Sequence, residues 1–367
     1  MKLKALGLGA LTLASVALLA ACGNNNSGST DSSAPAGGTD KTTVAIVTDT
    51  GGVDDRSFNQ SAWEGLQAWG KVHNLSQGQG GFNFFQSESE ADYDTHVNNA
   101  VSQGFNLVYG IGFKLHDAIA GAADRNPDTK FAIVDDVIDG KKNVVSITFA
   151  DNEGAYLAGV AAAKQSKSGV VGFVGGMTGT VIDRFEAGFR QGVYDTNPNV
   201  KVIVEYADSF NDATRGAAIT KTMIADGVDV IYHASGGTGA GVFQEAIRHN
   251  EGLSKDDDKK VWVIGVDRDQ TEEGNFTDKD GNKANLVLAS TVKGVGKAVE
   301  AVSDMLVDGK FPGGEVKVFG LANEGVSLFM ENAPSDIQDA VKAAQEKIVA
   351  GDITVPEAPS AVKDGSN

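Results

Sequence analysis

Residues 43–72 read TVAIVTDTGGVDDRSFNQSAWEGLQAWGKV, an apolar run followed by a glycine-containing loop and an amphipathic stretch. The run Thr43–Thr48 is apolar at consecutive positions and rich in β-branched residues, which is typical of a strand buried on both faces. In Ser61–Val72 the apolar residues recur with a helical period, which predicts a helix. A doubly buried strand followed by a helix is the repeating unit of a parallel sheet covered by helices.

The same unit recurs along the body of the chain, from about Thr42 to Val355. Further strands are predicted at Phe82–Gln86, Asn106–Gly110, Lys130–Val134, Val144–Phe149, Val170–Val174, Val200–Tyr206, Val228–His233, Val261–Val266, Ala284–Thr291 and Val316–Phe319. Helical patterns lie between most of them, and a last helix is predicted at Ser335–Val349. A body of roughly 310 residues is large for one core, so we expect an α/β protein with two doubly wound parallel-sheet lobes.

The late strands suggest that the chain returns to the first lobe after completing the second. We expect residues 42–149 and about 276–314 in the first lobe, and residues 150–275 and about 315–355 in the second. The crossings are predicted near Phe149–Asn152 and Asp267–Asn275, and residues 356–367 form a C-terminal tail.

The N-terminus predicts export and a lipid anchor. Two lysines precede a short apolar run, and the sequence Leu19-Ala20-Ala21-Cys22 contains the only cysteine of the chain. This pattern resembles a bacterial lipoprotein signal, in which residues 1–21 are removed and Cys22 is acylated. Residues 22–41 then form the lipidated cysteine and a polar, disordered tether that places the protein on the extracytoplasmic face of the cell membrane.

The charge balance excludes nucleic acid as a partner. The formal net charge of the chain is −18, and removal of Lys2 and Lys4 with the signal peptide would leave −20. No basic surface is then available to neutralise phosphates or to hold anionic lipid, so contact with the membrane is expected through the anchor only. We expect a monomer.

Suitable side chains follow several predicted strands, at the edge where open α/β sheets bind ligands. The first helix contributes two more from its N-terminal end. The candidate ligand-binding residues are Asp49, Phe58, Asn59, Asp135, Phe210, Gly236, Asp267 and Lys293.

Each of these residues also has a structural interpretation. An acid after a strand often caps the next helix, a phenylalanine at a helix start can pack locally, and most lysines are solvated. Several groups at strand ends in one chain nevertheless favour a shared cleft. Two aromatic faces can stack on a flat base, carboxylates can accept bonds from ribose hydroxyls and a base N–H, and a lysine can donate to sugar oxygens. The set therefore suits a nucleoside.

Enzyme and cofactor functions find little support. The five histidines show no metal-ligand spacing, and the sole cysteine lies in the predicted anchor. The run Gly236–Gly241 follows a strand but departs from the dinucleotide-binding spacing at Val242. No catalytic residue, cofactor or metal is predicted.

Several motifs, in order, resemble the basic membrane protein family, the purine nucleoside receptor A-like lipoproteins that serve ABC transporters. They are DDRSFN at 54–59, FAIVD at 131–135, FADNEGAYLAG at 149–159, GFVGG at 172–176, RFEAGF at 184–189 and FND at 210–212. The resemblance covers the whole body. It implies a type I periplasmic-binding-protein fold with three crossovers, an ABC permease as partner, and no enzymatic activity.

The resemblance also implies roles for the candidate residues. Phe58 and Phe210 would stack on the base, Asn59 and Asp135 would read its edge, and Asp267 and Lys293 would bind the ribose. Asp49 and Gly236 would line the pocket. The doubled acid Asp135-Asp136 leaves open which carboxylate faces the ligand.

Three other functions remain as alternatives to nucleoside delivery. The same fold could carry a pentose or an autoinducer-like sugar. A lipoprotein could instead bind host macromolecules through its surface, and a cleft hydrolase could act on nucleosides through Asp49, Asp135 and Asp267.

Overall fold

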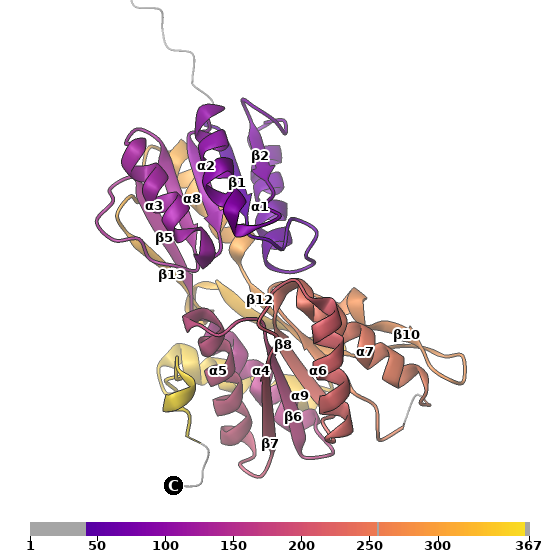
Figure 1. The fold of residues 1–367 in the computed structure, drawn as a ribbon. Coiled ribbons are helices and arrows are strands. Elements are labelled where there is room, and N and C mark those ends of the chain that lie inside the picture. Colours follow the sequence, from indigo (N-terminus) through magenta and orange to yellow (C-terminus); the bar gives the residue numbers. More distant parts are fainter. Residues whose placement is uncertain (1–41, 255–256, 364–367) are drawn as a thin grey trace, which may run out of the picture. The chain divides into compact units, whose positions relative to one another are not determined.

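The computed structural model describes residues 42–254 and 257–363. The predicted signal peptide, the acylated Cys22 and the tether lie outside the described residues and stay predictions. The fold class is confirmed: two parallel α/β sheets, each with its own helices, form the two lobes (Figure 1).

The first sheet has the strand order β13-β5-β4-β3-β1-β2, with all pairs parallel. Its strands are β1 (Val44–Thr48), β2 (Phe82–Phe85), β3 (Leu107–Ile111), β4 (Lys130–Val134), β5 (Val144–Phe149) and β13 (Val316–Phe319). Its helices are α1 (Phe58–Val72), α2 (Tyr93–Ser102), α3 (His116–Arg125) and α8 (Val295–Val307).

The second sheet has the order β14-β12-β9-β8-β6-β7, and only β14 is antiparallel to its neighbour. Its strands are β6 (Val170–Gly175), β7 (Lys201–Tyr206), β8 (Val230–Ala234), β9 (Trp262–Gly265), β12 (Val287–Lys293) and β14 (Val326–Phe329). Its helices are α4 (Asp151–Gln165), α5 (Thr180–Thr196), α6 (Ala213–Ala225), α7 (Gly239–Glu251) and α9 (Ser335–Ala350). A small hairpin, β10 (Asn275–Thr277) and β11 (Lys283–Asn285), extends beside α7 (Figure 1).

Alternation of side chains along each strand explains the layers. In β1, Val44 and Ile46 pack into a cluster that includes residues of α1 and α8, whereas Ala45 and Val47 pack into a second cluster with α2 and α3. Successive strand residues point to opposite faces, so a strand that is apolar throughout needs helices on both sides. The unbroken apolar run that predicted the fold is therefore buried on both faces.

The two lobes exchange late strands differently from the prediction. β12 joins the second sheet, although residues 276–314 were expected in the first lobe, and β13 joins the first sheet, although residues 315–355 were expected in the second. The predicted crossing near Asp267–Asn275 is therefore wrong, and the second crossing follows Lys293. β14 and the β10–β11 hairpin were not predicted. Strand patterns of three or four residues carry too little periodicity to assign a partner strand.

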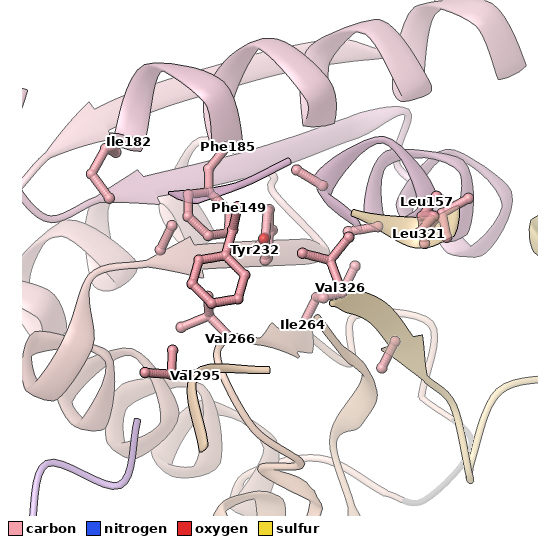
Figure 2. Close-up of a cluster of buried hydrophobic side chains, with 14 of the residues drawn as sticks. Phe149, Leu157, Ile182, Phe185, Tyr232, Ile264, Val266, Val295, Leu321 and Val326 are labelled. Atoms are coloured by element: carbon pink, nitrogen blue, oxygen red, sulfur yellow. The ribbon is translucent and has the colours of Figure 1, made fainter. Parts of the chain in front are cut away.

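Three crossovers connect the lobes, after β5, after β12 and between β13 and β14. They are hydrogen-bonded to one another. Ala150 N donates to Phe319 O and Gly294 N donates to Gly325 O, both at 2.8 Å. An apolar cluster with side chains from all three crossovers supports them, including Phe149, Val295 and Leu321 (Figure 2).

The described part of the expected C-terminal tail packs against the second lobe. Lys363 N donates to the side chain of Gln191 on α5 at 2.9 Å, and the Gln191 amide donates back to the carbonyl of Lys363 at 3.3 Å.

Candidate functional site

A cavity lies between the carboxyl ends of the two sheets. All eight candidate ligand-binding residues line it: Asp49, Phe58, Asn59, Asp135, Phe210, Gly236, Asp267 and Lys293.

Asn59 organises the acids at the first-lobe wall. Its Nδ2 donates to Asp49 Oδ1 at 2.7 Å and to Asp55 Oδ2 at 2.9 Å. Its donors are therefore engaged by carboxylates, and its side chain fixes them in place. Burial raises the pKa of Asp49 to about 6, although hydrogen bonds from Gly51 and Asn59 oppose the shift. Asp55 also accepts from the backbone N–H groups of Ser57, Asn59 and Gln60, so it caps the start of α1.

Lys293 is a buried cation at the floor of the cavity. Its side chain is 3% exposed, and its Nζ lies 2.7 Å from Asp135 and 3.1 Å from Asp151. Burial by itself would lower the pKa of Lys293. The surrounding carboxylates raise it by a larger amount, so the net shift is upward and the ammonium stays charged. The doubled acid is resolved by the same geometry: Asp135 lines the cavity, whereas Asp136 pairs with His116 Nδ1 at 2.7 Å.

Asp267 is held from across the cleft. Its carboxylate accepts a short hydrogen bond from the hydroxyl of Ser57, at the start of α1 in the opposite lobe. Burial raises the pKa of Asp267 to about 7, while Lys293 and the Ser57 hydroxyl oppose the shift.

Two of the site acids have a left-handed backbone. The φ angles are 67° at Asp135 and 69° at Asp267, directly after β4 and close after β9. This region costs free energy for a residue with a Cβ and persists only where the surrounding structure requires it. Both residues line the cavity.

The aromatic walls come from both lobes. Phe58 begins α1 in the first lobe, and Phe210 follows β7 in the second. Phe113, which follows β3, meets Phe210 edge-on, with ring centroids 6.4 Å apart. Gly236 has φ 55°, and a Cβ there would lie 3.2 Å from the Phe210 carbonyl, so glycine lets this loop approach Phe210 closely.

Ten further cavity residues were not predicted: Gly51, Asp55, Gly112, Phe113, Val181, Ile182, Phe185, Ala234, Ser235 and Val266. The strand-end argument could have found Phe113, because it follows β3 as the predicted residues follow their strands. Phe185 lies on α5 and projects toward Phe149 (Figure 2), a placement that no local pattern encodes.

Direct bonds close the lobes over the cavity. Arg56 pairs with Glu273, Glu64 pairs with Arg268 at 3.2 Å, and Asn211 Nδ2 donates to Thr50 O at 3.2 Å. Each of these contacts joins the first lobe to the second. The cavity therefore belongs to a closed arrangement.

The described residues hold no cluster of three or more His, Cys, Asp and Glu side chains that could bind a metal ion. Within the same ranges, no helix combines the length and apolarity needed to cross a bilayer.

Comparison with known proteins gives a family match over residues 42–358, to the family described as ABC transporter substrate-binding protein PnrA-like. The chain is 50% identical to the ABC transporter nucleoside-binding protein BmpA of Lactococcus lactis, over 97% of this chain and 99% of that protein. It is 52% identical to the CD4+ T-cell-stimulating antigen of Listeria monocytogenes, over 86% and 88%. Basic membrane protein A of Borreliella afzelii is 31% identical, over 85% and 91%.

Among solved structures, an ABC transporter solute-binding protein from Aeropyrum pernix superimposes with a TM-score of 0.71 at 23% identity, covering 87% of this chain and 95% of that one. GanP, a glucose-galactose binding protein from Geobacillus stearothermophilus, gives a TM-score of 0.55 at 15% identity, covering 79% and 98%. These similarities support the fold alone.

Proposed function

This chain belongs to the family of PnrA-like ABC transporter substrate-binding proteins, and from that premise we propose that its cavity binds a nucleoside and delivers it to a membrane permease. As a member of this family it is a transport protein and not an enzyme. The name of the Lactococcus relative supports the ligand class, and the cavity supports it independently.

One observation carries the proposal: Phe58 and Phe210 line a single cavity from opposite lobes. A flat base with both faces covered gains stacking from two rings, and a ligand that contacts both lobes stabilises the closed state. Asp135, Asp267 and Lys293 line the same cavity and supply acceptors and a donor for a base edge and a ribose.

The charge of the cavity favours a neutral ligand. Four carboxylates, those of Asp49, Asp55, Asp135 and Asp267, line it with a single ammonium. A phosphorylated ligand would face this excess of acids, so we propose nucleosides rather than nucleotides.

The test compares nucleosides with free ribose by calorimetry on the wild type, Phe58→Ala and Phe210→Ala. We expect inosine and guanosine to bind the wild type and each alanine variant to lose roughly tenfold or more, since stacking on one base contributes about 1–3 kcal/mol. Phe329→Ala is the matched control, because Phe329 is 39% exposed on β14 and does not line the cavity.

Three results would contradict the nucleoside proposal. Ribose binding as tightly as a nucleoside would favour the sugar alternative, and normal purine binding by both variants would exclude the aromatic clamp. Release of free base and ribose from inosine would indicate a hydrolase.

We propose further that Cys22 anchors the protein, as a monomer, to the outer face of the cell membrane. Cys22→Ser should remove the acylated sulfur and leave the protein unprocessed or released into the medium. Membrane fractionation with mass spectrometry of the N-terminus checks this. A mature, acylated serine variant that still fractionates with membranes would exclude the anchor.

A further inference from the structure

We propose that Asp151 is a positioning residue for ligand binding, which fixes the ammonium of Lys293 and joins the cavity to two of the crossovers. The inference rests on the proposed nucleoside function only where its test measures nucleoside affinity.

Asp151 lies at the first crossover and outside the cavity. It is the first residue of α4, two residues after β5 ends, and its side chain has 0% exposure. Its Oδ1 lies 3.1 Å from Lys293 Nζ, and its Oδ2 lies 3.4 Å from Nη2 of Arg184 on α5. Asp151 does not line the cavity, whereas Lys293 does. The carboxylate therefore reaches the site only through the lysine.

Lys293 lies at the second crossover, at the end of β12 and just before α8. Its ammonium is thus held between Asp135, on the cavity wall, and Asp151, behind it. An ammonium has three donors, and Lys293 donates to Asp135 Oδ2 at 2.7 Å, whereas Asp151 holds the ammonium by charge at 3.1 Å, so a donor remains for a ligand. Asp151, and more weakly Asp267, share the charge of this buried cation with Asp135, so Asp135 stays available to a bound base.

Aromatic rings surround the ammonium and exclude water from it. Lys293 Nζ lies 5.4 Å from the ring centroid of Phe58, 5.0 Å from that of Phe149 and 5.6 Å from that of Phe185. Figure 2 shows Phe149 and Phe185 together in this apolar cluster, with Phe185 projecting from α5. In such low-dielectric surroundings the orientation of an ammonium group depends strongly on the few carboxylates near it. Loss of one carboxylate should therefore turn the ammonium toward the other.

The alternative is that Asp151 only stabilises the start of α4. Acids in the first turn of a helix interact favourably with its dipole, and α4 has two of them, Asp151 and Glu153. Glu153 accepts a hydrogen bond from Leu321 N at 2.8 Å, which ties α4 to the third crossover without contact to Lys293. Glu153→Gln is therefore the matched control for helix and crossover effects.

The experiment measures guanosine affinity by calorimetry for the wild type, Asp151→Asn and Glu153→Gln. Asparagine keeps the size and removes the charge. We expect Asp151→Asn to weaken binding at least about tenfold, as for a charge-assisted contact, and Glu153→Gln to stay within about twofold. Equal affinities for Asp151→Asn and wild type, or equal losses in both variants, would overturn the positioning role.

A cycle with Lys293→Met gives the second affinity test. If Asp151 acts through the lysine, adding Asp151→Asn to the methionine variant should change guanosine affinity by less than about twofold. If Asp151→Asn still weakened guanosine binding about tenfold in the Lys293→Met variant, the proposal would be overturned. The double variant removes both partners of the pair, so it remains informative if Asp151→Asn alone does not fold.

A measurement without ligand separates the positioning role of Asp151 from the proposed nucleoside function. In the protein carrying isotope-labelled lysine, the buried ammonium of Lys293 should give a protected NMR signal that shifts or disappears in Asp151→Asn and persists in Glu153→Gln. An unchanged signal in Asp151→Asn contradicts the positioning role. A wild type that binds no nucleoside contradicts the proposed function instead, and this signal still decides the role of Asp151.

Discussion

Two acids of the site, Asp49 and Asp267, are shielded from solvent, and nearby positive charges and hydrogen bonds do not fully offset this. Asp267 is buried and Asp49 is half-buried, and removal from solvent raises the pKa of each, to about 7 and about 6. In the ligand-free protein these carboxyl groups therefore have unused hydrogen-bonding capacity, and a polar ligand can donate hydrogen bonds to them.

At this residue scale, Asp267 should make stability depend on pH. An acid with a raised folded pKa retains its proton when folded at a pH where the unfolded chain has lost it, so stability falls as pH rises from about 4 to about 7. From pH 7.5 to 5.5, the ligand-free wild type should gain about 2 kcal/mol relative to Asp267→Asn. Denaturant unfolding of both proteins at the two pH values checks this, and parallel pH profiles would show that Asp267 does not titrate there.

At the scale of elements, glycines set the distance between α4 and α5. A Cβ on Gly188 would lie 2.1 Å from the Asn152 carbonyl oxygen, and one on Gly159 would lie 2.2 Å from the Phe189 carbonyl oxygen. These are backbone atoms on the facing helix, so no side chain can rotate away. The close pair supports Asp151 and Arg184, one from each helix.

Gly188→Ala should therefore destabilise the fold by about 1–3 kcal/mol, the usual cost of overpacking, despite the higher helix propensity of alanine. Gly121→Ala in α3 is the control, since its Cβ would meet only the flexible end of Arg125 at 3.2 Å. We expect that variant to gain about 0.4–1 kcal/mol. Thermal unfolding of both variants measures the difference, and a stabilised Gly188→Ala would mean that the helices can separate freely.

At the scale of the whole described molecule, closure depends on paired charges on the two lobes. Arg56 and Glu64 in the first lobe face Glu273 and Arg268 in the second. The pairs are partly exposed, and such pairs contribute about 0.2–1 kcal/mol each. They belong to the closed arrangement and are expected to break when the lobes separate.

Glu273→Gln should therefore raise the nucleoside dissociation rate by up to about fivefold and leave the association rate nearly unchanged. The difference from wild type should shrink in about 1 M salt, where the screening length falls to about 3 Å. Stopped-flow fluorescence at low and high salt measures both rates. Asp124→Asn is the control, because Asp124 pairs with Lys141 within the first lobe. Equal dissociation rates for Glu273→Gln and wild type would exclude a role in closure.

The sequence by itself determined the layered α/β architecture and eight cavity residues. Strands buried on both faces can be recognised from the local sequence, because few other structures fit an apolar run followed by an amphipathic helical pattern. Parallel strands present their carboxyl ends at one edge, so residues that follow the strands, such as Asp135 and Asp267, could be gathered into one site without coordinates.

Only the tertiary structure decided the exchange of β12 and β13 between lobes, the partners of Lys293, and the choice of Asp135 over Asp136. Strand exchange depends on pairing energies between segments far apart in the chain, which a local pattern does not contain. Asp151 is a first-turn acid of α4, and its contact with a lysine more than a hundred residues away arises because two crossovers meet. Long-range contacts of this kind are fixed by packing, whereas periodicity reports only which face of an element is buried.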